Sequence, residues 1–307
     1  MNAPHNHRQF AATSVLSPAE EAAPTQPTSE MSIGELIAKA NNLSVEQIES
    51  ILTYQRENGV RFGEAAVALG LANTDDVIWA LAQQFHYPYS SETNRSSLDP
   101  ELVVGAQPFT EQAESFRAIR SKLIMQLFSE ERPRHALAII SPESGDGKTF
   151  FAANIAVAFS QLPGRTLIID ADMRNSRLHN LFKLKEHSSG LSSILSGRAA
   201  SRVIQSVSGL PSLYVLPVGV VPPNPLELLE RPAFGLMMRE LKTKFDRIIV
   251  DTPAMSSGAD AAVVAARCGA AMVIARRDAS RYSGAAEMIK TMRLANVELV
   301  GSVLNEY

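Results

Sequence analysis

The stretch from Ala136 to Gln161 constrains the fold most strongly. Five apolar residues, Ala136–Ile140, lead into the loop Ser141–Thr149, of sequence SPESGDGKT, and a helical pattern begins there. An apolar strand, a glycine-containing loop ending in Gly-Lys-Thr and a helix form the arrangement of a P-loop. Gly145 and Gly147 let backbone N–H groups turn toward phosphate oxygens, and the helix N-terminus adds its positive dipole end. The stretch therefore predicts a phosphate site.

Two residues of this loop supply charge and a metal ligand. Lys148 is a flexible positive charge for the β- and γ-phosphates of a nucleotide, and the Thr149 hydroxyl can ligate magnesium. The spacing G-x-x-x-x-G-K-[ST] places Pro142 where its first glycine belongs, so the loop departs from the usual pattern. The predicted nucleotide-binding set is Ser144, Gly145, Asp146, Gly147, Lys148 and Thr149.

Aspartates follow two other apolar runs. Asp170 and Asp172 lie two residues apart after the run Thr166–Ile169, so their side chains point the same way and repel unless a cation or proton lies between them. Asp251 follows Arg247–Val250, where a P-loop enzyme holds its magnesium directly or through water. Polar strand ends or a helix cap would use the same residues, but three agreeing elements favour the nucleotide site. The predicted metal ligands are Thr149, Asp170 and Asp251.

Strand-length and helix-length patterns alternate from His135 onward. Strands without strict alternation, each followed by a helix, predict an α/β fold: a P-loop NTPase-like, mostly parallel sheet with helices on both faces. The expected strands are Ala136–Ile140, Thr166–Ile169, Leu213–Leu216, Arg247–Val250, Ala271–Ala275 and Leu299–Leu304. The expected helices are Thr110–Phe128, Lys148–Gln161, Pro225–Lys244, Ala259–Ala266 and Gly284–Ala295.

The first third of the chain has sequence patterns that differ from those of the rest. Residues 1–29 lack an apolar period and predict a disordered tail. Residues 30–90 contain a 29-residue internal repeat of two short helical patterns per copy, which predicts a small helical module with Trp79 in its core. Ser44 and Thr74 are the expected N-caps, and only Ser44 is expected to form a capping box. Residues 91–107 read as a linker and 108–307 as the nucleotide-binding domain.

Composition limits which partners and which cellular compartment we expect for this protein. The net charge of −3 gives no basic surface for nucleic acid, and the single Cys268 favours a reducing compartment. No apolar run approaches the roughly 20 residues that cross a bilayer, and no signal peptide is evident. We therefore expect a cytoplasmic protein that needs a partner to reach a membrane.

The aspartate elements carry a family resemblance. The run Asp170-Ala171-Asp172-x-Arg174 with Asp251-Thr252-Pro253 resembles the deviant-Walker ATPases of septum positioning and plasmid partition. Three features are similar to the bacterial tyrosine kinases of polysaccharide export: Glu143 in place of a signature lysine, the loop 219–229 containing PPNPLELL, and an E-x-x-R-x-x-R motif. The last is Glu114, Arg117 and Arg120. The resemblance covers about residues 107–307.

This resemblance implies a protein-tyrosine (auto)kinase of the exopolysaccharide chain-length-determinant type, with ATP and Mg²⁺ as cofactors. It implies a catalytic set of Lys148, Asp170, Asp172 and Asp251, in which one of the paired aspartates helps to deprotonate a tyrosine. It implies an adenine contact at Asn305. It also implies ring formation through Glu114, Arg117 and Arg120, activation by a separate membrane protein, and a peripheral position at the inner face of the plasma membrane.

Family kinases usually end in a tyrosine-rich tail, whereas this sequence stops at Tyr307. Tyr307 is the candidate phosphoacceptor, and another protein could serve instead. The missing tyrosines favour an alternative, an ATP-binding scaffold with little kinase activity. Glu143 argues against a second alternative, a partition-type ATPase.

The helical module is similar to the N-terminal domain of type II secretion and type IV pilus ATPases. Some members of that family bind cyclic di-GMP through one R-L-G-type motif per repeat. The second repeat fits with Arg61-Phe62-Gly63, but Ser32 replaces the arginine of the first repeat. A serine cannot stack on a guanine or fork-bond a phosphate. A structural or protein-docking module is therefore favoured over a cyclic di-GMP site.

Overall fold

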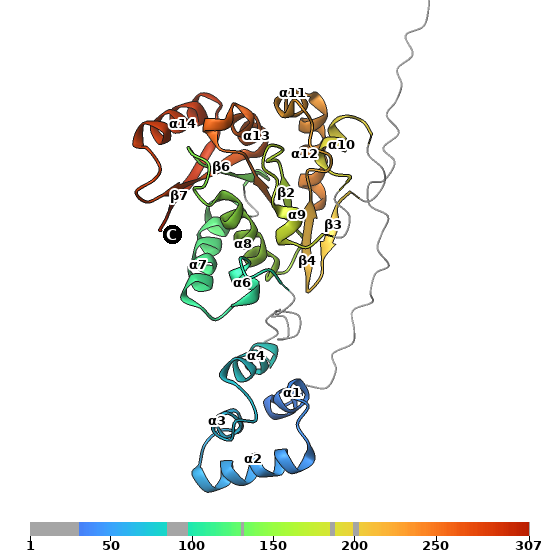
Figure 1. Ribbon diagram of the computed structural model, residues 1–307, viewed down its shortest axis with the longest axis vertical. Helices are drawn as coiled ribbons and strands as arrows, with labels where there is room; N and C mark the ends of the chain where they lie inside the picture. Colours follow the sequence, from blue (N-terminus) through green and yellow to red (C-terminus); the bar gives the residue numbers. More distant parts are fainter. Residues whose placement is uncertain (1–30, 85–97, 130–131, 185–187, 199–202, 307) are drawn as a thin grey trace, which may run out of the picture.

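The computed structural model describes residues 31–84, 98–129, 132–184, 188–198 and 203–306 (Figure 1). The predicted tail 1–29, residues 91–97 of the predicted linker and Tyr307 lie outside the described residues. Among the described helices, none is both long and apolar enough to cross a membrane.

A seven-stranded sheet organises residues 136–305, in the order β3-β4-β2-β5-β1-β6-β7. All neighbouring strands pair in parallel except β3 and β4. The predicted fold class is confirmed, and the six expected strands form, five of them with longer bounds than expected. The strands are β1 Ala136–Ile140, β2 Thr166–Asp170, β3 Gln205–Val207, β4 Leu210–Leu216, β5 Arg247–Asp251, β6 Gly269–Arg276 and β7 Glu298–Asn305.

This order decides where the functional residues meet. Strand β5 lies between β2 and β1, so the carboxyl ends of these three parallel strands are neighbours. The P-loop follows β1, and Asp170 and Asp251 end β2 and β5 as direct register partners. Ligands of open α/β sheets bind at this edge.

Strand β3 was missed. It has three residues, of which only Val207 is buried, and it pairs antiparallel with β4 across a turn containing Gly209 at φ +78°. So short and polar a run has no strand period to detect.

Helices cover both faces of the sheet (Figure 1). On one face, Leu137 and Ile139 of β1 join a cluster with α6, α7, α8 and α9; on the other, Ala136, Ala138 and Ile140 join a cluster with α10 to α14. The helices are α6 Val103–Ala106, α7 Glu111–Gln126, α8 Lys148–Ser160, α9 Leu178–Leu181, α10 Leu191–Leu195, α11 Pro225–Glu230, α12 Pro232–Lys244, α13 Asp260–Cys268 and α14 Tyr282–Leu294.

One predicted helix is wrong in its extent. The stretch Pro225–Lys244 forms two helices, α11 and α12, separated at Arg231, which is extended at φ −58° and ψ 143°. The ring of Pro232 disfavours helical geometry at the residue before it, and proline is tolerated at the first position of the new helix.

The predicted linker is wrong for residues 98–107. These residues form the short helix α6 and bury Leu98, Leu102 and Val104 in the cluster that contains α8. Asn154 of α8, itself fully buried, accepts from the Val104 N–H at 3.1 Å and donates to the Glu101 carbonyl at 2.7 Å. The packed body of the nucleotide-binding domain therefore includes Leu98.

Residues 33–84 form the expected two helices per repeat. Helix α1 packs on α4 and α2 packs on α3, which are equivalent contacts when the repeats are exchanged. A small buried core consists of Ile37, Ile51, Ala65, Ala66 and Ala80, against which the partly buried Trp79 packs. The four helices are α1 Ile33–Ala40, α2 Val45–Asn58, α3 Phe62–Ala68 and α4 Thr74–Gln84.

The caps of the module correct one prediction. Ser44 forms the expected capping box with Gln47. Thr74 is the first residue of α4 and not its cap, because Asn73 accepts from the Asp76 N–H at 2.8 Å while Asp76 accepts from the Asn73 N–H at 2.9 Å. The second repeat thus has a reciprocal cap of its own, one residue earlier than expected.

Candidate nucleotide site

The P-loop connects β1 to α8. Gly147 caps α8 at φ +94°, and Gly145 lies at φ +85°, a region that residues with a Cβ rarely adopt. Apart from its two chain neighbours, no atom of the described residues lies within 4 Å of the place where a Cβ of Gly145 would be. The loop backbone is therefore open to a ligand at the N-terminus of a 13-residue helix, which favours anions.

Asp146 braces this loop. Its side chain is buried and accepts from the Glu143 N–H at 2.9 Å and from the Ser280 hydroxyl at 2.8 Å. Asn305, at the end of β7, donates to the Asp146 carbonyl at 3.1 Å. Asp146 was predicted to be a nucleotide-binding residue, whereas the role of Ser280 was not predicted, because a single serine after β6 carries no sign of a contact with the P-loop.

Asp251 and Thr149 form the metal-like part of the site. The Thr149 hydroxyl donates to one carboxylate oxygen of Asp251 at 2.7 Å, and the other oxygen is buried with no hydrogen-bond partner among the described residues. Burial raises the pKa of Asp251 to about 7, and the nearby Asp172 acts in the same direction. An orphaned carboxylate oxygen beside a hydroxyl fits a hard cation such as Mg²⁺, which prefers oxygen ligands.

Asp170 is enclosed by groups of its own chain. It is fully buried, accepting from the Ser176 hydroxyl at 2.7 Å and from the Asp172 N–H at 3.2 Å. Burial, followed by the charge of Asp251, raises the pKa of Asp170 well above its ordinary value. A second charged carboxylate this close to Asp251 is stable only with a proton or cation between them.

Asp172 faces a cavity of about 690 Å³. One of its oxygens accepts from the N–H groups of Arg174 and Asn175, at 3.1 and 2.8 Å, which fixes the loop after β2. Arg174 in turn forms an ion pair of 3.0 Å with the buried Asp260. The cavity is lined by Pro100, Glu101, Val103, Gln112, Ser144, Gly145, Gly147, Lys148, Thr149, Phe150, Asp172, Asn175 and Arg177.

The structure thus brings Lys148, Thr149 and Asp172 to one cavity and places Asp251 directly behind Thr149. Another part of the lining, Pro100, Glu101, Val103 and Gln112, was not predicted. The first three come from the expected linker, which packs against α8, whereas Gln112 lies in the expected helix Thr110–Phe128.

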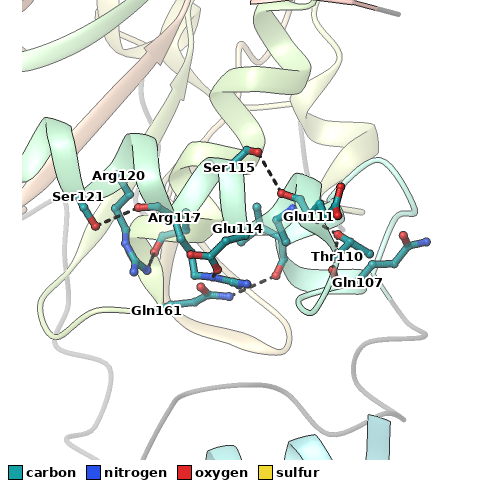
Figure 2. Close-up of polar contacts among 12 residues, drawn as sticks. Gln107, Thr110, Glu111, Glu114, Ser115, Arg117, Arg120, Ser121 and Gln161 are labelled. Carbon is teal, nitrogen blue, oxygen red and sulfur yellow. Dashed lines mark hydrogen bonds and ion pairs between the residues drawn. The ribbon is translucent and has the colours of Figure 1, made fainter. Parts of the chain in front are cut away.

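The E-x-x-R-x-x-R residues lie along α7 (Figure 2). Glu114 is exposed and accepts from Arg117 at 2.7 Å. Arg117 is 16% exposed, and Arg120 donates to the Ala158 carbonyl at 2.8 Å, near the end of α8. Figure 2 shows both arginines on the side of α7 that faces Gln161, the residue after α8. Glu114 is therefore the exposed member of the motif, and the arginines are engaged within the chain.

The profile of the CobQ/CobB/MinD/ParA nucleotide-binding domain matches residues 137–307. The tyrosine-protein kinase CpsD of Streptococcus agalactiae is 34% identical over 193 residues, which cover 63% of this chain and 82% of CpsD. EpsB of Ralstonia solanacearum is 32% identical over 204 residues, 66% of this chain, and this chain spans only 27% of the length of EpsB.

Two solved structures are similar to this chain in fold and in sequence. The kinase domain of the Escherichia coli tyrosine kinase ETK matches with a TM-score of 0.62 and 32% identity, covering 67% of this chain and 79% of that domain. The chimerical protein CapA2B2 matches with a TM-score of 0.62 and 31% identity, covering 67% and 90%. The chain belongs to the bacterial tyrosine-protein kinases, within the CobQ/CobB/MinD/ParA family of nucleotide-binding domains.

Proposed function

We propose that the protein is an ATP- and Mg²⁺-dependent protein-tyrosine kinase that phosphorylates other copies of itself. The observation that carries this proposal is the cavity in which the carboxylate of Asp172 lies together with Lys148 and Thr149, so that a proton acceptor lines the same cavity as the phosphate loop.

Different residues bind the phosphates, hold the metal and accept the proton in this proposal. The N–H groups of the loop and Lys148 hold the phosphates of ATP, while Thr149 and Asp251 hold the metal, which neutralises phosphate charge when bound. A tyrosine hydroxyl has a pKa of about 10 and needs help to lose its proton at neutral pH. Asp172 lines the cavity, which supports the proposal that its carboxylate accepts that proton. Asp170 is enclosed behind it and keeps a supporting role.

The wider role is part of the proposal. We infer that the kinase regulates exopolysaccharide chain length and export, and that a separate membrane protein activates it and brings it to the inner face of the plasma membrane. Self-association uses α7 through Glu114, Arg117 and Arg120, and Tyr307 is the candidate acceptor. Asn305 is the candidate adenine contact. Cyclic di-GMP at the helical module remains a less favoured prediction.

A scaffold that binds ATP without phosphotransfer is the second candidate function. One experiment separates the candidates. The protein is incubated with ATP, Mg²⁺ and the activator's cytoplasmic segment, and phosphotyrosine and free phosphate are followed together.

Phosphotyrosine that disappears in Lys148→Met supports the kinase. Free phosphate without phosphotyrosine indicates a partition-type ATPase. Neither product, with ATP still bound, indicates the scaffold and rejects the proposal.

A further inference from the structure

An arginine outside the predicted site reaches into the same cavity. Arg177, at the start of α9, lines the cavity together with Lys148 and Asp172. Its Nη2 forms an ion pair of 2.7 Å with Glu101, which also lines the cavity. The two side chains are 53% and 43% exposed. Such an exposed pair contributes little to stability, so it exchanges partners easily.

The backbone under both partners is fixed. The carbonyl of Glu101 accepts from the buried Asn154, and the loop before Arg177 is held by the bonds of Asp172 to Arg174 and Asn175. The carbonyl of Arg177 also accepts from the N–H groups of Asn180 and Leu181 in α9. The ion pair can therefore open through its side chains alone.

Charge decides where Arg177 goes when a nucleotide arrives. Glu101 offers one negative charge, whereas a terminal phosphate offers more charge and oxygens that match the guanidinium fork. Among the hydrogen bonds of the described residues, Arg177 uses only one of its nitrogens, so its fork is available.

We propose that Arg177 binds the terminal phosphate of the nucleoside triphosphate and that Glu101 holds it aside until that phosphate is present. The inference rests on the proposed ATP site. Arginine stabilises the charge of a phosphoryl group in transfer, so Arg177 acts as an arginine supplied by the subunit's own chain.

The test measures binding by the full-length protein to Mg-ADP and to a non-hydrolysable Mg-ATP analogue, using calorimetry. A charge-assisted contact changes an equilibrium by roughly 10- to 100-fold. We expect Arg177→Ala to weaken the analogue by about tenfold or more and ADP by less than about twofold, with Arg177→Lys in between. Glu101→Gln removes the carboxylate that competes with the phosphate for Arg177. The analogue should therefore bind several-fold tighter, and the affinity for ADP should not change.

Two controls change the same charges at exposed positions away from the cavity, Arg239→Ala on α12 and Glu287→Gln on α14. Both should leave the two affinities unchanged. Equal effects of Arg177→Ala on ADP and analogue, or no effect on either, would overturn the assignment. If the unchanged protein binds neither nucleotide, the proposed ATP site itself is rejected and Arg177 has no phosphate to bind.

Discussion

At the scale of single residues, three aspartates of the site differ in what their oxygens touch. Asp170 is enclosed by Ser176 and backbone N–H groups, Asp251 keeps one buried oxygen without a partner, and Asp172 faces the cavity. The same side chain therefore serves as a buried support, a candidate metal ligand and a candidate base. Burial and hydrogen bonding, rather than residue type, separate the three roles.

The raised pKa of Asp251 makes stability depend on pH. The unfolded chain loses this proton near pH 4, whereas the metal-free folded protein holds it up to about pH 7. The stability gained from the folded-state proton is therefore lost as pH rises from about 4 through about 7. We expect Asp251→Asn to raise the free energy of unfolding by about 2–4 kcal/mol at pH 8 and by much less at pH 5.

Urea unfolding in the presence of a chelator measures this difference. The exposed Asp278→Asn serves as control and should change neither value, since its side chain is 95% exposed. Asp170 also has a raised pKa, so some pH dependence remains in Asp251→Asn. An equal gain at pH 5 and pH 8 would contradict the assignment.

Asp172 is the proposed base, and an amide tests it. Asp172→Asn keeps an oxygen for the N–H groups of Arg174 and Asn175, so the loop should hold its shape. General-base assistance typically contributes 10²–10⁴-fold, and we expect phosphotyrosine formation to fall by about that factor. Nucleotide affinity, measured alongside by calorimetry, should change by less than about threefold. Retention of the full rate would rule Asp172 out as the base.

At the scale of elements, residues 98–107 belong to the domain because α8 holds them. Asn154 satisfies the Val104 N–H and the Glu101 carbonyl from a fully buried position. Helix α8 thus carries the phosphate site at one end and anchors another part of the cavity lining along its side. Few local signals predict such a contact, because its partners lie about 50 residues apart.

Removing this anchor should destabilise the domain. Asn154→Ala leaves the buried Val104 N–H and the part-buried Glu101 carbonyl without partners, and we expect a loss of about 1–3 kcal/mol in the free energy of unfolding. The matched change Gln161→Ala removes a 3.3 Å bond to the Val104 carbonyl from a half-exposed side chain and should cost less than about 1 kcal/mol. Urea denaturation compares the two. Equal small losses would show that hydrophobic burial alone holds residues 98–107.

At the scale of the whole molecule, α7 combines a proposed role in self-association with contacts inside the chain. Glu114 is 69% exposed, whereas Arg120 is bonded to the end of α8. A variant that removes both therefore confounds assembly with stability. Glu114 and Arg120 therefore have to be substituted separately to test the proposed role of the motif between subunits.

Glu114→Lys changes the exposed residue alone. Its i,i+3 ion pair with Arg117 joins an exposed carboxylate to a side chain that is only 16% exposed, so we expect a small fall in melting temperature. Self-association, measured by sedimentation, should weaken by about tenfold or more, because a charge is reversed at the proposed interface. Arg120→Ala should lower the melting temperature as well. Glu287→Lys, an exposed change on α14, should affect neither; unchanged assembly in Glu114→Lys would remove α7 from the interface.

The sequence by itself determined the fold class, six of the seven strands among the described residues, the P-loop and the aspartates at the ends of β2 and β5. These follow from local patterns, because apolar strand runs, a glycine-lysine-threonine turn and caps act over a few residues. Tertiary structure alone decided that Ser176 encloses Asp170, that Ser280 braces Asp146, and that residues 98–107 close the cavity with Glu101 facing Arg177. Those contacts join distant residues whose meeting depends on the order of the strands and on burial against α8. Neither the strand order nor the burial against α8 can be predicted from a local sequence period.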